Sequence, residues 1–153
     1  MSRWSRVFGA SSTPPEPSAL LECVRGLGIS ATGDFQADTQ GWFLVELEPT
    51  GLPSIRVERF LAAEEGIRQE LNSWAAWVES VEDRAIHGLL MHHIVSTTQL
   101  FTCEIPAVSA GPEQIDMVCA GVCQFLARQT GGVYQIDGQG FFSADGKLLV
   151  AEP

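Results

Sequence analysis

The period of hydrophobicity changes within the stretch Trp42–Asp83, which reads WFLVELEPTGLPSIRVERFLAAEEGIRQELNSWAAWVESVED, and this change decides the fold class. In the first half, apolar and polar residues alternate on both sides of the turn Pro49–Pro53, which is typical of paired antiparallel strands. In the second half, apolar residues recur every three or four positions, at Ile67, Leu71, Trp74, Val78 and Val81. This spacing lines one side of a helix, so we predict a helix over 62–83 that packs on a core.

The residues before Pro49 predict a hairpin. The runs 29–35 and 42–48 flank the turn-rich segment Gln36–Gly41, and the strand that begins at Ile55 extends the hairpin into an antiparallel meander. Strict alternation in the second run assigns side chains to two faces. We place Phe43, Val45 and Leu47 toward the core, and Trp42, Leu44, Glu46 and Glu48 on the outer face.

The N-terminal residues are predicted to form an arm. A short helix is expected over 16–25, where apolar residues recur at helical spacing before Gly26 and Gly28. The piece Trp4–Phe8 is separated from this helix by a proline-rich segment over 10–17. Residues 1–15 are therefore expected to be an edge strand or a docked arm, followed by a linker.

The C-terminal half continues with helices and short strands. Residues 84–95 fit either a helix or a strand, and we predict a helix, followed by a strand over 97–105. Ser109–Glu113 has the proline and acid typical of a helix start, which predicts a last helix over 112–129. The turn dipeptides Asp137-Gly138 and Asp145-Gly146 separate strands expected over 133–136, 140–143 and 147–150.

Together these elements predict a single α+β domain over residues 1–153. We expect a mainly antiparallel sheet with three to four helices packed on one face. The β-α-β-β order of the first 48 residues would fit a ferredoxin-like half. A chain of 153 residues buries enough surface to fold without disulfides or a structural metal.

The charge of the chain excludes several classes of function. Nine Lys and Arg stand against nineteen Asp and Glu, a formal net charge of −10, and Lys147 is the only lysine. Nucleic acids and anionic membrane surfaces bind clustered cations, so we expect neither as a partner. An apolar run long enough to span a bilayer and a signal-peptide core are both absent, and the four cysteines form no C-x-x-C pair. We therefore expect a cytoplasmic protein with reduced thiols. The preference for Arg over Lys, with many Ala and Gly, suggests a bacterial origin.

The histidines and cysteines do not predict a catalytic, cofactor or metal site. Two histidines of one helix share a metal when they lie three or four residues apart, whereas His87, His92 and His93 are separated by one, five and six. Cys119 and Cys123 fall on the inner side of the last helix, where free thiols behave as small hydrophobic groups. No hydrolase, phosphate-binding or calcium-binding motif is present.

Three residues are candidates for recognition of a partner: Trp42, Trp77 and Met117. The two tryptophans lie beside the predicted apolar stripes, and tryptophan is enriched at binding hot spots, although the rim of a core is the more common place for such a residue. Met117 belongs to an apolar outer side of the last helix, with Ala120, Gly121 and Ala127. We expect another element of the same chain to cover that side, in preference to a partner or a second copy in a homodimer.

These observations predict a non-catalytic, acidic, cytosolic protein that binds another protein, in the manner of an adaptor, immunity or inhibitor protein. The alternative hypothesis is a small enzyme or small-molecule-binding domain whose pocket combines residues distant in sequence, with His92 or Cys103 as participants.

Overall fold

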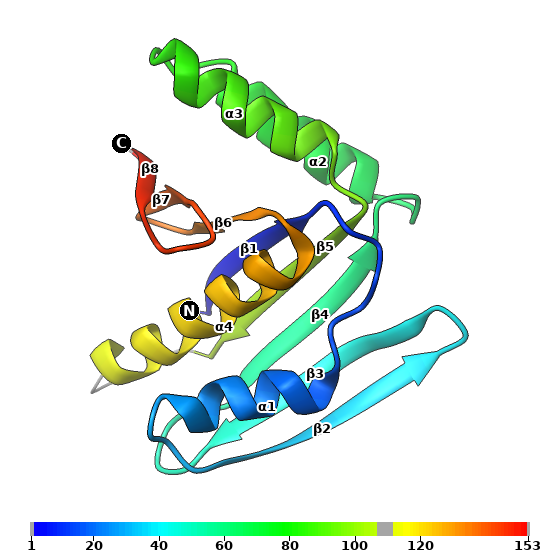
Figure 1. Ribbon diagram of the computed structural model, residues 1–153, viewed down its shortest axis with the longest axis vertical. Coiled ribbons are helices and arrows are strands. Elements are labelled where there is room, and N and C mark those ends of the chain that lie inside the picture. Colours follow the sequence, from blue (N-terminus) through cyan, green and yellow to red (C-terminus); the bar gives the residue numbers. More distant parts are fainter. Residues whose placement is uncertain (1, 107–111, 153) are drawn as a thin grey trace.

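The computed structural model describes residues 2–106 and 112–152, which contain four helices and eight strands (Figure 1). The strands are β1 (Arg3–Gly9), β2 (Ala31–Asp38), β3 (Gly41–Pro49), β4 (Ile55–Leu61), β5 (Gln99–Ile105), β6 (Val133–Ile136), β7 (Gly140–Phe142) and β8 (Leu148–Ala151). The helices are α1 (Pro17–Gly26), α2 (Ile67–Val78), α3 (Arg84–Val95) and α4 (Pro112–Thr130). The α+β class is confirmed. In the described residues no helix combines the length and the apolar character that crossing a bilayer requires.

The strands form one antiparallel sheet in the order β2-β3-β4-β5-β1-β6-β7-β8. β1 pairs with β5 on one side and with β6 on the other. The expected edge strand or docked arm is thus wrong, because β1 is a central strand. Three strands lie between β1 and β2, so the first 48 residues do not form a ferredoxin-like half, in which a single strand separates the first strand from the strand after the helix.

The helices cover both faces of the sheet, which corrects the expectation of helices on one face. On one face, α1 and α4 enclose a core cluster that includes Val7, Phe101 and Tyr134. On the other, α2 and α3 enclose a second cluster with Phe8, Leu100 and Phe141. The physical reason lies in β1: consecutive residues of a strand point to opposite faces, and Val7 and Phe8 are both fully buried. Figure 1 shows α2 and α3 as a helical hairpin at one end of the sheet.

Most of the predicted elements are confirmed, with small shifts at their ends. The hairpin β2–β3, the meander to β4, helix α3, strand β5 and the three short C-terminal strands lie where they were expected. Helix α2 is shorter than the predicted 62–83 at both ends: it begins after Gly66, which adopts a left-handed φ of 86° at the N-cap, and it ends at Val78. Helix α4 agrees with 112–129, whereas the predicted start at Ser109–Gly111 lies outside the described residues.

A β-bulge at the β2–β3 hairpin changes the predicted faces of β3. Gln36 pairs with Leu44 and Ala37 with Trp42, so Phe43 is an extra residue in the ladder. The alternation shifts by one at this point: Trp42 is 3% exposed and belongs to the cluster under α1 and α4, whereas Phe43 is 40% exposed. The predictions of an outward Trp42 and an inward Phe43 are both wrong.

Candidate functional site

One face of the central strands is left partly open by the helices. Trp4 and Arg6 of β1 pair across the sheet with Glu104 and Thr102 of β5. These β5 residues pair in turn with residues of β4 on the same face, namely Arg56 and Glu58. We call the residues Trp4, Arg6, Arg56, Glu58, Phe60, Thr102 and Glu104 the open face; each of them is half-buried or exposed. The residues between them in the strands, including Ser5, Val57 and Cys103, point to the side of α1 and α4 and are buried.

A hollow of about 360 Å³ lies where the open face meets the start of α2. Trp4, Phe60 and Ile67 supply apolar walls, and Glu65 and Glu70 bring carboxylates to the same hollow. Glu65 is exposed in the turn before α2. Gly66 follows it as the N-cap of the helix. The hollow therefore combines aromatic and acidic groups from segments that are far apart in sequence.

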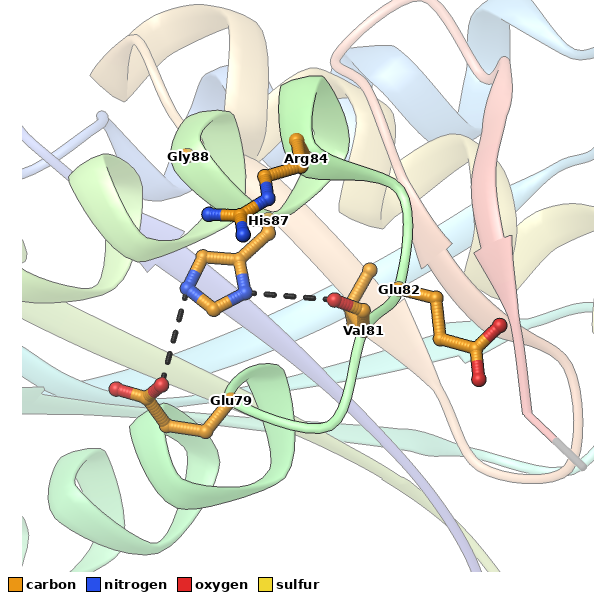
Figure 2. Close-up of a pocket in the computed structure, with 6 residues that line it drawn as sticks. All are labelled: Glu79, Val81, Glu82, Arg84, His87 and Gly88. Atoms are coloured by element: carbon orange, nitrogen blue, oxygen red, sulfur yellow. Dashed lines mark hydrogen bonds and ion pairs between the residues drawn. The ribbon is translucent and has the colours of Figure 1, made fainter.

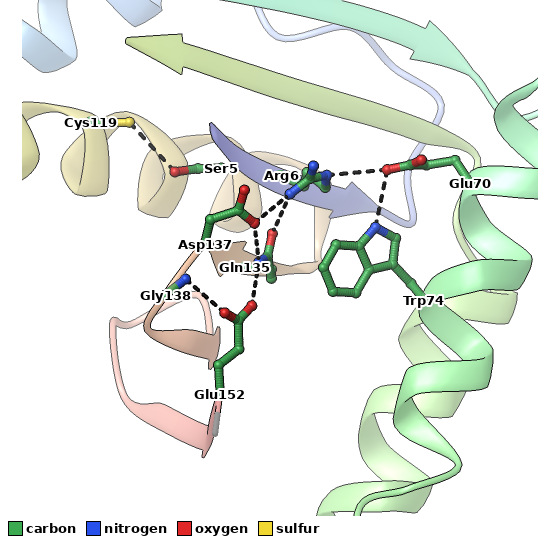
Figure 3. Close-up of polar contacts among 9 residues, drawn as sticks. All are labelled: Ser5, Arg6, Glu70, Trp74, Cys119, Gln135, Asp137, Gly138 and Glu152. Carbon is green, nitrogen blue, oxygen red and sulfur yellow. Dashed lines mark hydrogen bonds and ion pairs between the residues drawn. The ribbon is translucent and has the colours of Figure 1, made fainter. Parts of the chain in front are cut away.

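Arg6 lines this hollow and is the centre of a polar network (Figure 3). Its Nη1 lies 2.8 Å from Asp137 Oδ1, and its Nε lies 3.2 Å from Glu70 Oε1. Nη1 also donates to the side-chain oxygen of Gln135 at 3.0 Å, and the guanidinium carbon lies 5.1 Å from the ring centre of Trp74. With its side chain only 18% exposed and paired with two carboxylates, Arg6 ties β1, α2 and the β6–β7 turn together and contributes little free positive charge.

The open face and its hollow are acidic. Arg56 lies between two carboxylates: its Nη1 is 3.9 Å from Glu46 Oε1, and its Nε is 3.5 Å from Glu58 Oε1. Within the described part of the chain, Glu65 and Glu104 have no cationic side chain at ion-pair distance. The carboxylates of the open face and of the hollow are thus only partly neutralised, and a cation from outside can approach the exposed Glu65 at the hollow.

The three residues predicted for recognition lie in three different environments. Trp42 is buried, its ring centre lies 5.7 Å from that of Phe101, and its Nε1 donates to the carbonyl of Pro15. Trp77 is half-buried at the rim of the second cluster, with its ring centre 5.4 Å from that of Phe141. Met117 is 49% exposed on α4. The structure does not bring them together, and Trp42 is too buried to touch a partner.

The apolar outer side of α4 is covered mainly by the same chain, as expected. The Leu27 side chain, just after α1, lies against Gly121, where an added Cβ would meet it at 3.0 Å. Cys23 of α1 donates to the carbonyl of Gly121 at 3.5 Å, and Ala127 is fully buried. Met117 remains the exposed part of this side.

A second hollow, of about 380 Å³, lies at the junction of α2 and α3 (Figure 2). His87 is its centre: Nδ1 lies 3.4 Å from the carbonyl of Val81, and Nε2 lies 3.8 Å from Glu79 Oε2. Both contacts link α3 to the end of α2 and its turn, and they add to the apolar packing between the two helices.

The residues named for the alternative hypothesis lie on opposite sides of the sheet. His92 is exposed on α3, and its ring centre lies 5.9 Å from that of His93, whose pKa is lowered by burial and by the neighbouring His92. Cys103 is fully buried and faces α4. The two side chains therefore form no common site. Among the described residues, no group of three His, Cys, Asp or Glu side chains is arranged to hold a metal ion.

Sequence reasoning missed the open face, because its residues converge only through the pairing of β1 with β5, across roughly a hundred residues of chain. The one local signal was the alternation of Trp4 and Arg6 with Ser5 and Val7, which indicates a strand with two different faces. Comparisons of the chain with protein-family models, with curated proteins and with solved structures find no match in any of the three. The function is therefore inferred from the geometry and the charge of this site.

Proposed function

We propose that this protein is a non-catalytic, acidic module of the bacterial cytoplasm that binds a protein partner through the open face, in the manner of an adaptor, immunity or inhibitor protein. The observation that carries the proposal is the hollow between the open face and α2, in which Trp4 and Phe60 lie beside the carboxylates of Glu65 and Glu70. The partner chemistry that fits is a segment with an apolar or aromatic side chain flanked by Lys or Arg.

The charge of the molecule supports a basic partner. The net charge of −10 attracts cationic surfaces over distances of about one Debye length, roughly 8 Å at physiological salt. Close to the face, Glu65 and Glu104 offer carboxylates that are not committed to ion pairs within the described residues. Charge complementarity of this kind raises the rate of association and rejects acidic partners.

The shape of the site supports an anchor side chain. The aromatic walls are Trp4 of β1 and Phe60 of β4, the two strands on either side of β5. Desolvated aromatic contacts supply a large part of the binding free energy at protein interfaces. Arg6, held by Glu70 and Asp137, forms a fixed part of the hollow and needs no rearrangement on binding. A preformed hollow lowers the entropic cost of association.

The experiment is a calorimetric titration with two defined peptides. The first is an eight-residue peptide that alternates Lys with Leu or Phe, and the second has Glu in place of each Lys. We expect the basic peptide to bind with an affinity that falls as salt is added, and the acidic peptide not to bind. Binding of both peptides with equal affinity would contradict the proposal, and so would the absence of binding by either.

Two charge-reversal variants locate the interaction. Glu65→Lys changes an exposed carboxylate at the hollow, and Glu22→Lys makes the same change of charge on α1, on the opposite side of the sheet. We expect Glu65→Lys to weaken binding by about tenfold, which corresponds to about 1.4 kcal/mol, and Glu22→Lys to change it by less than about twofold. Equal effects of both variants would mean that the net charge of the whole molecule attracts the peptide, and not the hollow. If sedimentation shows a dimer and Glu65→Lys dissociates it, the occupant of the hollow is a second copy of the chain instead.

A small-molecule-binding domain is the second candidate function. Its support is the volume of the hollow, about 360 Å³, which lies within the range of ligand pockets, and the origin of its walls in β1, β4, α2 and β5. Native mass spectrometry of the freshly purified protein separates the two functions. A stoichiometric bound small molecule that Trp4→Ala removes would favour this second function over the first.

A further inference from the structure

Three cysteine thiols meet between β5 and α4, on the side of the sheet opposite to the open face. Cys103 Sγ and Cys123 Sγ lie 3.9 Å apart, and Cys119 lies one helical turn before Cys123 on α4. Ser5 pairs directly with Cys103 across β1 and β5, and its hydroxyl lies 3.8 Å from Cys119 Sγ (Figure 3). The cluster thus joins β5 to α4, two elements that follow one another in the chain.

Only one of the three thiols reaches a space that a small molecule can enter. Cys103 and Cys123 are fully buried, whereas Cys119 is 4% exposed and lines a hollow of about 150 Å³ with Arg3 and Asp116. One water occupies roughly 30 Å³ of liquid, so the hollow has room for hydrogen peroxide, which is one oxygen atom larger. Cys119 is therefore the thiol that an oxidant meets first.

The surroundings of Cys119 favour its thiolate, which is the form that reacts. Hydrogen bonds from the thiols of Cys103 and Cys123, with a smaller contribution from Ser5, outweigh the opposing effect of burial and hold the pKa of Cys119 well below its ordinary value. The positive charge of Arg3, 2.8 Å from Asp116, acts in the same direction. The contact with Cys119 raises the pKa of Cys103, which keeps that thiol protonated.

We propose that Cys119 is a peroxide-oxidised site and that Cys103 converts the oxidised sulfur into a disulfide between α4 and β5. In the first step the Cys119 thiolate attacks one oxygen of the peroxide, the O–O bond breaks, and the other oxygen leaves and takes a proton as water. Sulfur loses two electrons and becomes a sulfenic acid, while the peroxide is reduced. In the second step the Cys103 sulfur attacks the sulfenic sulfur, the S–O bond breaks, and water leaves with the Cys103 proton.

The position of Cys123 allows a third step by thiol–disulfide exchange. Its sulfur lies 3.9 Å from that of Cys103, and a bond requires an approach to about 2.05 Å. Attack of Cys123 on the Cys103 sulfur would form a Cys103–Cys123 disulfide and release the Cys119 thiol, with no net change of oxidation state. Either disulfide fixes β5 to α4.

Cys23 provides a matched control within the same chain. It is half-buried between α1 and α4, its thiol donates to the carbonyl of Gly121, and burial raises its pKa. It has no second thiol at hydrogen-bonding distance among the described residues. Cys23 is thus expected to react slowly and to form no intramolecular disulfide.

The experiment treats the reduced full-length protein with a few equivalents of hydrogen peroxide and measures its intact mass without reductant. We expect a loss of two hydrogen masses, reversed by dithiothreitol, with peptide mapping that links Cys103 to Cys119 or Cys123. Cys119→Ala should slow this loss at least tenfold, and Cys23→Ala should leave its rate unchanged. A gain of oxygen without loss of hydrogen, or an unchanged rate in Cys119→Ala, would overturn the proposal.

A second measurement uses the native chain alone, which covers the case in which Cys119→Ala does not fold. Dimedone traps sulfenic acids as stable adducts. Added together with the peroxide, it should label Cys119 and reduce the yield of the disulfide. An adduct found on Cys23 and not on Cys119 would overturn the proposal.

Discussion

Replacing Trp42 by alanine tests whether this side chain belongs to the core or to a recognition surface. In the structure Trp42 is 3% exposed, its ring centre lies 5.7 Å from that of Phe101, and its Nε1 donates to the carbonyl of Pro15. Truncation of a buried tryptophan costs about 3–5 kcal/mol, through lost contacts and the cavity that remains. A buried carbonyl that loses its donor adds a cost of about 1–3 kcal/mol, part of which overlaps with the first.

We therefore expect Trp42→Ala to lower the free energy of unfolding by about 4 kcal/mol, a large part of the 5–15 kcal/mol typical of a domain. Urea denaturation followed by far-ultraviolet circular dichroism measures this change. Trp42→Phe keeps an aromatic ring beside Phe101 but removes the N–H donor and part of the buried indole, so its cost should be about 1–3 kcal/mol, below that of Trp42→Ala.

Trp77→Ala is the comparison at a rim position. Its ring contacts Phe141 and Trp74 but stays partly in solvent, so we expect a loss of about 2 kcal/mol, below that of Trp42→Ala. The reasoning would be refuted if Trp42→Ala changed the stability by less than about 1 kcal/mol. A loss above about 3 kcal/mol for Trp77→Ala would place that residue in the core as well.

Three further predictions concern backbone fit and pH. Gly88→Ala should stabilise the protein by about 0.5–1 kcal/mol in thermal or urea unfolding, because Gly88 lies inside α3 with open space around its Cβ position. Gly132→Ala should destabilise it by at least about 2 kcal/mol in the same assay, because the added Cβ would lie 1.9 Å from the backbone oxygen of Phe8; a neutral effect would contradict the packing of β6 on β1. Burial, with a smaller effect of His92, lowers the pKa of His93 in the folded state, so the unfolded chain binds this proton more readily and stability is lost as pH falls below about 6.5. The urea midpoint should therefore drop more between pH 7.5 and 5.5 in the native chain than in His93→Gln, and equal drops would contradict this assignment.

The elements of this fold were predictable where local signals agree. Helix α2 follows from apolar spacing, and the short C-terminal strands follow from Asp137-Gly138 and Asp145-Gly146, because tight turns depend on the residues that form them. Residues 84–95 fit either a helix or a strand by their spacing, and the structure shows the predicted helix α3. Face assignments failed at Trp42, where a bulge inserts one residue and reverses the alternation. A bulge has no reliable local signature, since it depends on the partner strand.

The candidate site was less predictable than the elements that carry it. Trp77 and Met117 were chosen from their places on helices, whereas Phe141, which contacts the Trp77 ring, comes from a distant strand. The convergence of Cys103 with Cys119 and Cys123 was also missed, because the spacing of cysteines in a chain does not say which strand faces which helix.

By itself, the sequence determined the fold class, the acidic net charge and, for most segments, whether they are helices or strands. The reason is that net charge depends on composition alone, and local periodicity depends on residues close together in the chain. Only the tertiary structure decided that β1 is central, that helices cover both faces, and that Trp4, Phe60 and Glu65 surround one hollow. The physical reason is that strand pairing joins residues far apart in the chain, and its register is set by the burial of two cores at once.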